Sequence, residues 1–301
     1  MLNGVINVYK EKGFTSHDVV ARMRGIFKQR KIGHTGTLDP DAEGVLPVCL
    51  GSATKLCDML TDRSKTYEAV LLLGITTDTE DAGGTVLSER SVTCTAEEAV
   101  SCVRSFEGPY LQVPPMYSAI KVNGKKLVDL ARKGITVERK ARPVEIYSIS
   151  VSETALPRIR FSADCSKGTY IRTLCSDIGE RLGCGGIMES LVRTRSGRFG
   201  IADAVRLETL EECVRDGEPG RFLVPPEECF PELPKLWSLP EGDRFLRNGN
   251  PLKTSLADLS KSGLPELPEG YRARVYDSAG RFAGLFCEKE GLLRPEKMFL
   301  S

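Results

Sequence analysis

One aspartate in the stretch GHTGTLDPDAEG, residues 33–44, is the first candidate for chemistry. Asp39 stands directly before Pro40, which fixes its own φ and restricts the residue in front of it. An aspartate is ionised at neutral pH because its unperturbed pKa is about 3.9, so it can serve as a nucleophile or a proton acceptor. The nearby Asp41 and Glu43 do not imply the converging carboxylates that glycoside hydrolysis uses. The pattern predicts a reaction that needs one carboxylate.

The usual cofactor and metal motifs are missing from the sequence. Neither GHTGTLDPDAEG nor GCGG, at 183–186, fits a phosphate loop or a dinucleotide-binding fingerprint. The ten cysteines never form a CxxC pair and the only histidines are His17 and His34, so no zinc site is expected. Ser16, His17 and Asp18 are consecutive on an expected helix and point in different directions, which excludes a hydrolase triad. We therefore expect no metal and no cofactor.

Length and composition predict an ordinary globular protein. The 301 residues favour a main domain with a smaller one attached. No apolar run approaches the roughly 18 residues that a membrane helix needs, and the start MLNGVINVYKEKGF lacks the pattern of a secretory signal. Ten scattered cysteines fit a reducing compartment, where they act as small hydrophobic residues. We expect a cytoplasmic protein with no membrane partner.

Charge is balanced over the whole chain but not along it. Lys and Arg total 42 against 41 Asp and Glu, whereas residues 121–142 hold eight cations and two anions. The cations are Lys121, Lys125, Lys126, Arg132, Lys133, Arg139, Lys140 and Arg142. Such a run fits a surface that faces nucleic acid, although a solvated charged face is the more common explanation when the run is taken alone.

Several stretches have the periodicity of regular elements. TSHDVVARMRGIFKQRK predicts an amphipathic helix that Thr15 or Ser16 caps. KTYEAVLLLG, at 65–74, alternates like a strand, and TTDTEDAGGTV, at 76–86, predicts a loop without calcium-binding spacing. RIRFSADCSKGTYIRTLCSDIGERLG, at 158–183, predicts a strand, a loop and a helix.

The predicted helix before residue 183 has signals at both ends. Thr169 can cap its start, and Gly183 stands where a left-handed end is expected. Lys167, Tyr170 and Arg172 then lie near the helix N-terminus, which is a natural site for an anion.

The chain changes character beyond residue 219. Six of the 17 prolines lie between Pro219 and Pro240 and predict a connection between domains. YRARVYD and RFAGLFCEKE, joined by a SAG turn, predict a hairpin with Val275 opposite Phe282 and with Phe286 as a further core candidate. About sixty residues of short strands predict a small β-barrel.

Five stretches, in a fixed order within residues 3–205, resemble the TruB family of RNA pseudouridine synthases, in particular its bacterial members. They are KIGHTGTLDPDAEGVLPVCLGSATKL, KTYEAVLLLG, QVPPMYSAIKVNGKKL, DCSKGTYIRTLCSDIGERLG and LVRTRSGRF. The resemblance implies an α+β fold with a mixed, largely antiparallel sheet. It also implies a catalytic domain over 1–224 with an RNA-clamping insertion at about 109–143, a Pro-rich linker over 225–240, and a PUA-like RNA-binding β-barrel over 241–301.

The resemblance implies isomerisation of uridine 55 in the T-loop of tRNAs to pseudouridine. In this reaction the N1–C1′ bond breaks, the uracil rotates, and the base is rejoined through C5, without metal or cofactor. By resemblance the catalytic residue is Asp39. Three roles stay open for its carboxylate: addition to the ring, attack at C1′, or removal of the 2′ proton.

Five more residues match family positions in the active site. Arg172 would pair with the catalytic aspartate and hold it charged. Tyr67 would stack on the flipped uracil, Tyr170 would line the cavity, and Leu191 would pack against the base. His34 would help to hold the RNA with its base flipped out. Without the motifs, each of these side chains would be interpreted as packing, a turn residue or surface.

The basic run falls in the insertion that clamps the T-arm in the family. The RNA-binding candidates are Lys121, Lys125, Lys126, Arg132 and Lys133. Val128 stands where the family often has tyrosine, which leaves that contact open. The implied partner is tRNA, without a guide RNA, bound by a monomer with an affinity that falls with salt.

Two other functions stay open. One is that of the archaeal and eukaryotic relatives that small RNAs guide, which is disfavoured because their motifs match less closely. The other is a catalytically silent chaperone that flips and refolds tRNA. Asp39, Tyr67 and Arg172 together argue against loss of catalysis, although not against chaperone activity alongside it.

Overall fold

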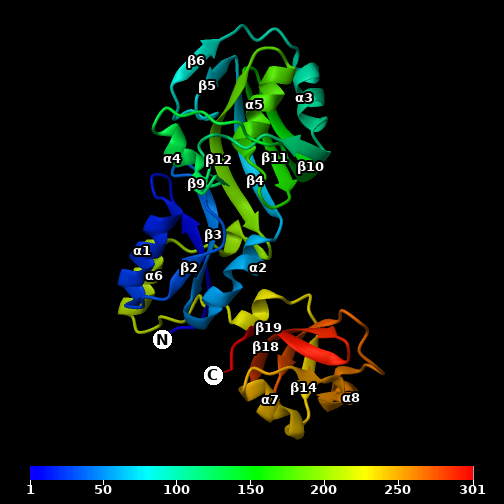
Figure 1. The fold of residues 1–301 in the computed structure, drawn as a ribbon. Helices are drawn as coiled ribbons and strands as arrows, with labels where there is room; N and C mark the ends of the chain where they lie inside the picture. Colours follow the sequence, from blue (N-terminus) through cyan, green and yellow to red (C-terminus); the bar gives the residue numbers. More distant parts are fainter. Residues whose placement is uncertain (301) are drawn as a thin grey trace.

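The computed structural model describes residues 1–300 and shows two β-sheets that follow one another along the molecule (Figure 1). A nine-stranded sheet uses the first two thirds of the chain, and a six-stranded sheet uses the last third. No helix in residues 1–300 is long and apolar enough to cross a membrane. The fold is α+β, as predicted.

The large sheet is mixed and mostly antiparallel, which confirms the predicted sheet type. Its strands run in the order β1-β3-β12-β4-β11-β10-β7, with β2 beside β3 and β13 beside β12. Strands β12 and β3 pair in parallel. The bounds are β1 Gly4–Lys10, β2 Ile32–His34, β3 Glu43–Leu50, β4 Lys65–Leu73, β7 Gly108–Gln112, β10 Arg142–Ala155, β11 Arg158–Cys165, β12 Gly186–Ser196 and β13 Phe199–Gly200.

Strand β4 has β12 on one side and β11 on the other. Its alternate residues Tyr67, Ala69 and Leu71 are buried in one cluster with helices α3 (Ala96–Arg104) and α5 (Ile171–Arg181). Figure 1 shows both helices beside β10, β11 and β12. Full burial of a large apolar side chain stabilises the fold by about 1.5–3 kcal/mol, so this alternation fixes which face of β4 points toward α5.

Helix α1 spans Ser16–Phe27 and begins at a capping box. Thr15 Oγ1 accepts a hydrogen bond from Asp18 N, and the Asp18 carboxylate accepts one from Thr15 N. This exchange satisfies two amides that the helix leaves free. The apolar face of α1 packs against β1 and β3 together with α6 (Leu207–Arg215). Thr15 is therefore the cap, and the Ser16 hydroxyl is left for another contact.

The segment at 76–86, predicted to be a loop, is partly a hairpin. Strand β5 (Ile75–Thr77) pairs with β6 (Val86–Glu89) in antiparallel register. The Asp81 carboxylate closes the turn between them by accepting hydrogen bonds from Thr79 Oγ1 and Gly83 N. The prediction was wrong at both ends because two short strands across a long turn leave too few residues to show a period of two.

Helix α5 starts without its predicted cap. The N-cap is Tyr170, and Thr169 Oγ1 instead donates a hydrogen bond to Ser166 O. The predicted end is confirmed, because Gly183 follows the C-cap Leu182 with a φ of +77°, a conformation that glycine adopts without strain. Thr169 therefore shapes the loop before the helix.

Short elements lie between β7 and β10 and between β3 and β4. They are the hairpin strands β8 (Lys121–Val122) and β9 (Lys125–Lys126), helix α4 (Leu127–Ala131), and the short helix α2 (Cys57–Thr61) after β3. The Leu127 side chain is fully buried, so it anchors the segment around it. This segment, residues 121–142, holds the basic run and is called the basic segment below.

The second sheet is barrel-like, with strands in the order β15-β19-β18-β17-β14-β16. Its strands are β14 Lys235–Ser238, β15 Leu252–Lys253, β16 Ala257–Asp258, β17 Arg272–Tyr276, β18 Phe282–Lys289 and β19 Leu292–Met298, with helices α7 (Asp243–Arg247) and α8 (Leu259–Ser262). Their apolar side chains form a separate core.

The predicted hairpin of β17 and β18 exists, but its register differs. Val275 pairs with Gly284, and Phe282 pairs with Tyr276 across a bulge. Val275 and Phe286 lie in the core of the second sheet, as expected, whereas Phe282 packs against the cluster between the two sheets. The bulge adds one residue to a strand, which sequence alternation does not reveal.

The two sheets are in direct contact. Leu285 of β18 is buried in the same cluster as Val5 of β1. Lys297 Nζ lies 2.7 Å from Asp58 Oδ2, and Lys55 donates to the Met298 carbonyl. The predicted bounds of the domains, the linker and the insertion stay predictions.

Candidate active site

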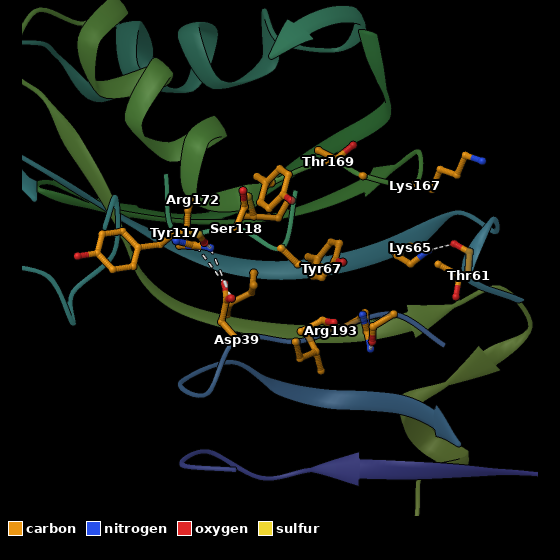
Figure 2. Close-up of a pocket in the computed structure, with 18 of the residues that line it drawn as sticks. Asp39, Thr61, Lys65, Tyr67, Tyr117, Ser118, Lys167, Thr169, Arg172 and Arg193 are labelled. Carbon is orange, nitrogen blue, oxygen red and sulfur yellow. Dashed lines mark hydrogen bonds and ion pairs between the residues drawn. The ribbon is translucent and has the colours of Figure 1, made fainter. Parts of the chain in front are cut away.

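A cavity of about 420 Å³ lies where distant parts of the large sheet meet. Its walls come from the loop after β2, the start of β4, the start of α5, the far half of β12 and the segment at 117–119 (Figure 2). Asp39, Tyr67, Tyr170, Arg172 and Leu191 all line it. The structure therefore brings five of the six predicted active-site residues to one cavity.

Asp39 and Arg172 form an ion pair in this cavity. Arg172 Nε lies 2.9 Å from Asp39 Oδ2, and Nη2 lies 3.4 Å from Oδ1. The arginine side chain is only 4% exposed, while that of Asp39 is 40% exposed. Two charge-assisted contacts from one guanidinium fix the plane of the carboxylate, and the exposed part remains open to a substrate.

Arg172 is itself held by the backbone. Its Nη1 donates to the Thr79 carbonyl at 3.0 Å and its Nη2 donates to the Tyr117 carbonyl at 2.8 Å. The guanidinium thus joins α5 to the β5–β6 turn and to the segment before β8. Because lysine offers a point charge in place of this planar fork, it could not replace all these contacts at once.

Asp81 is a second carboxylate at the site that the sequence did not indicate. Its Oδ2 lies 3.8 Å from Arg172 Nε. The acid-rich stretch at 76–86 lacks calcium-binding spacing, and nothing in its sequence relates it to Asp39. Contacts with α5 and β12 hold the β5–β6 turn in place, because Thr173 Oγ1 donates to Glu80 and Ala82 N donates to the Met188 carbonyl. Only the tertiary structure therefore reveals this neighbour.

The pKa of Asp39 is raised above that of an ordinary aspartate. Burial is the main cause, and the charge of Asp81 adds to it. Arg172 acts in the opposite direction through its charge and hydrogen bond. Arg172 therefore opposes the effect of burial and of Asp81, and favours the carboxylate form of Asp39.

The loop that carries Asp39 is anchored at both ends. Leu38 N donates to Ser16 Oγ at 2.9 Å, which ties the loop to the start of α1. The Lys10 ammonium donates to the Pro40 carbonyl at 3.1 Å. Gly36 has a φ of +102° and lies over the side chains of β4 and β12, where a larger residue would be strained. These contacts hold Asp39 in place before any ligand arrives.

Tyr67, Tyr170 and Leu191 surround the same space from three elements. The Tyr67 and Leu191 side chains are 8% and 7% exposed and come from the neighbouring strands β4 and β12. Tyr170 is fixed through its backbone, which exchanges two hydrogen bonds with the Gln112 side chain. Their predicted contacts with a flipped base stay predictions.

His34 lies outside the residues that line the cavity. It is half-buried on β2, and its ring meets that of His17 edge-on, with 6.2 Å between the centroids. Within residues 1–300 its Nδ1 has no hydrogen-bond partner. Burial lowers the pKa of His34, so the ring is neutral at neutral pH and has an unused polar atom. Its predicted contact with RNA stays a prediction.

The basic segment borders the cavity and has a hollow of its own. The cavity that contains Asp39 is also lined by Tyr117, Ser118, Ala119 and Val128. Val128 therefore lies at this site, and its predicted family contact stays open. Four of the five RNA-binding candidates line a second cavity of about 410 Å³: Lys121, Lys125, Lys126 and Lys133. Arg132 does not line it.

Two buried cations at the site were missed by the sequence analysis. Lys65 and Arg193 both line the cavity, with exposures of 6% and 0%. They lie within KTYEAVLLLG and LVRTRSGRF, which carried the family resemblance without a role for either residue. A lysine at a strand end and an arginine in a strand are commonly exposed, so their burial could not be anticipated.

The chain matches two family models and many curated relatives. The models are "TruB family pseudouridylate synthase (N terminal domain)" over residues 24–171 and "tRNA pseudouridylate synthase B C-terminal domain" over residues 172–230. A tRNA pseudouridine synthase B of Lachnoclostridium phytofermentans is 51% identical over 99% of this chain and 100% of its own length. One from Bacillus licheniformis is 42% identical over 100% of this chain and 98% of its own length.

Solved structures agree with these matches. A Cbf5-Nop10-Gar1 complex contains a chain with a TM-score of 0.74 and 28% identity, over 98% of this chain and 84% of that one. An H/ACA RNP bound to a substrate RNA containing 2′-deoxyuridine contains a chain with a TM-score of 0.73 and 26% identity, over 99% of this chain and 85% of that one. The fold, the site and these identities together show that this chain belongs to the TruB family of pseudouridine synthases.

Proposed function

We propose that this protein isomerises uridine 55 in the T-loop of tRNA to pseudouridine, with Asp39 as its catalytic residue. The observation that carries the proposal is the ion pair of Asp39 with the buried Arg172, in a cavity that apolar and aromatic side chains also line. Relatives with up to 52% identity are named tRNA pseudouridine synthase B. The reaction is an isomerisation in which the substrate only exchanges a proton with its surroundings, so one carboxylate that is regenerated in each cycle is sufficient.

The target base enters the cavity after it leaves the RNA stack. Asp39 lies on the wall of a cavity that a uridine stacked in the T-loop could not enter, so the nucleotide is turned outward. Tyr67 and Leu191 then contact the two faces of the uracil, and Tyr170 borders the ribose. His34, beside the cavity, occupies part of the space that the base vacates in the RNA.

Asp39 acts on the bound uridine as an ionised carboxylate. Arg172 holds it in one orientation, which removes the need to order it during the reaction. Attack at C1′, removal of the 2′ proton and addition to the ring all begin from this same charged state. In each route the N1–C1′ bond breaks and the C5–C1′ bond forms, and Asp39 is regenerated as a carboxylate.

The basic insertion binds the T-arm backbone. Lys121, Lys125, Lys126, Arg132 and Lys133 contribute positive charge there, which attracts phosphates without reading sequence. Residues 241–301, as a PUA-like unit, extend the RNA-binding surface. We further propose that the protein works in the cytoplasm as a monomer and without a guide RNA, since its own insertion and second sheet supply the contacts.

Release of tritium from tRNA labelled at uridine C5 tests the proposal. Wild-type protein should release tritium because C5 loses its hydrogen when it bonds to C1′, and Asp39→Asn should release none while still binding tRNA. Asp41→Asn, two residues along and exposed, is the matched control and should remain active. No release by the wild type would refute the enzyme, and undiminished release by Asp39→Asn would refute Asp39 as the catalyst.

A further inference from the structure

Three cationic side chains around the Asp39 loop are buried without a carboxylate partner. Lys10, Lys65 and Arg193 are 0%, 6% and 0% exposed, and none forms an ion pair within residues 1–300. Each donates to backbone carbonyls instead: Lys65 to Thr61 and Arg63 at 2.7 Å each, and Arg193 to Val45 and Gly36 at 2.7 and 3.3 Å. Carbonyl contacts satisfy hydrogen bonds but leave the positive charge uncompensated.

Lys65 and Arg193 lie beside the residues that would hold the base. Arg193 is directly opposite Tyr67 in the register of β12 and β4, and Leu191 is two residues before Arg193. Lys65 is two residues before Tyr67 on β4. Side chains two apart on a strand share a face, and all four residues line the cavity. A base held by Tyr67 and Leu191 therefore has both cations at its edge.

The charges in the cavity are unevenly distributed. Four cations line it, Lys65, Lys167, Arg172 and Arg193, against the single acid Asp39. Arg172 is matched by Asp39, and Lys167 Nζ lies 2.9 Å from Asp62 Oδ1, so the unmatched cations are Lys65 and Arg193. Figure 2 shows Tyr67 between the Asp39–Arg172 pair and Lys65. A neutral uracil does not need this arrangement, whereas an anion at that end would compensate charges that are otherwise costly to bury.

We propose that Lys65 and Arg193 form an anion site that stabilises the uracil base as its N1 anion when the C1′–N1 bond breaks. This proposal rests on the proposed function. It adds two catalytic residues, whose role is to stabilise the departing base rather than to orient Asp39.

The electron balance of the reaction supports this assignment. The electron pair of the C1′–N1 bond stays on N1. The base therefore leaves with one negative charge, which is spread over N1 and the carbonyl oxygens of the uracil. In the two routes that do not begin with addition to the ring, Asp39 becomes neutral in the same step, as an ester to C1′ or as the acid after taking the 2′ proton. The negative charge thus moves from the Arg172 end of the cavity toward Lys65 and Arg193.

The second half of the reaction reverses this movement. C5 of the anion bonds to C1′, and Asp39 leaves as a carboxylate or returns its proton to C2′. C5 then loses its proton and N1 gains one, which gives neutral pseudouridine. The two cations interact more strongly with the anion than with either neutral base, and fixed charges in a water-poor cavity favour that state most.

The first experiment compares Lys65→Met and Arg193→Met with the wild type under single-turnover conditions. Cleavage of the C1′–N1 bond should slow by about 10²–10³-fold, which is the effect of removing one group that stabilises charge in a transition state. The affinity for tRNA should stay near that of the wild type. Arg195→Met is the matched control, because Arg195 lies on the same strand and pairs with Asp164 outside the cavity. Lys65→Arg, which keeps the charge, should recover part of the rate.

The second experiment changes the base that leaves. Fluorine at C5 makes the uracil anion more stable by itself, so tRNA containing 5-fluorouridine depends less on the protein's cations. The rate is measured as the disappearance of 5-fluorouridine from the tRNA. With this substrate the ratio of the wild-type rate to the variant rate should be clearly smaller than the ratio with uridine. A structural role in the loop predicts the same ratio for both substrates.

The outcomes separate this proposal from the proposed function. Equal ratios for the two substrates would overturn the anion site while leaving the enzyme intact. The proposal would also be overturned if the variants lost tRNA affinity with a reduced salt dependence but broke the C1′–N1 bond of bound tRNA at the wild-type rate. The two cations would then bind an RNA phosphate. Absence of wild-type tritium release from uridine would overturn the proposed function itself.

Discussion

Arg172 contacts Asp39 from α5 while its other donors reach the carbonyls of Thr79 and Tyr117. One buried guanidinium thereby joins the Asp39 loop, the β5–β6 turn, the segment before β8 and helix α5. The predicted RNA-binding lysines begin at Lys121, four residues after Tyr117, so the same arginine joins that segment to Asp39.

Replacement of Arg172 should separate catalysis from binding. Arg172→Ala leaves Asp39 without its ion-pair partner and without a fixed orientation, so we expect kcat to fall by about 100-fold, the effect that misplacing a reacting group has. Arg172→Lys should recover only part of this rate because it lacks the planar fork. Steady-state kinetics and filter binding measure the two effects, and an equal loss of tRNA affinity would contradict the assignment.

The acid side of the pH profile should report Asp39. Its pKa is raised by burial and by Asp81, against the effect of Arg172, and catalysis needs the carboxylate form. As pH falls, kcat/KM should therefore decline at a higher pH than an exposed aspartate would give, and the decline in Arg172→Met should begin higher still. An unchanged midpoint in Arg172→Met would show that the limb belongs to another group.

Asp81 allows a test of charge apart from structure. Asp81→Asn can still accept hydrogen bonds from Thr79 and Gly83, but it removes the negative charge that raises the pKa of Asp39. The acid limb of the profile should consequently move to lower pH. Asp78→Asn is the control, since Asp78 bonds Thr85 N in the same turn and forms no ion pair with Arg172. A shift of similar size in the control would indicate a change in the turn instead.

The salt dependence of tRNA binding should identify the lysines of the insertion. Removing one lysine–phosphate interaction lowers the slope of log K against log salt concentration by about 0.7–0.9. We expect such a drop for Lys125→Ala and for Lys126→Ala, with a uniform loss of affinity across tRNAs. Arg22→Ala, whose partner is Glu211 on α6, should keep the wild-type slope. Unchanged slopes in both lysine variants would remove them from the RNA surface.

The buried lysines predict an unusual pH dependence of stability. Desolvation lowers the pKa of Lys10 and of Lys65 to about 8 in the folded protein, against about 10.4 in an unfolded chain. Between these values the unfolded state binds more protons, so the contribution of each lysine to stability rises with pH. The melting temperature of Lys65→Met minus that of the wild type should therefore decrease from pH 7 to pH 10. A difference independent of pH would contradict the depressed pKa.

Local patterns predicted the elements that act alone. The helix at 16–27 and the strand at 65–73 have strong periods of 3.6 and 2, and the structure has both. The register of β17 and β18 was wrong because a bulge depends on the partner strand. The predicted cap of α5 was wrong because Thr169 lies before the N-cap Tyr170, where its hydroxyl donates to the Ser166 carbonyl. Errors thus occur where two segments, rather than one, decide the geometry.

The amino-acid sequence by itself determined the family, the sheet type and the position of Asp39, because these depend on ordered motifs and on the order of elements along the chain. Only the tertiary structure decided which side chains share the cavity with Asp39. Lys65 and Arg193 reach it through the register of β4 with β12, and the β5–β6 turn brings Asp81 to the far side of Arg172, with its Oδ2 3.8 Å from Arg172 Nε. A sequence does not show which cations are buried, since burial depends on what packs around them, and that burial gives this site its charge.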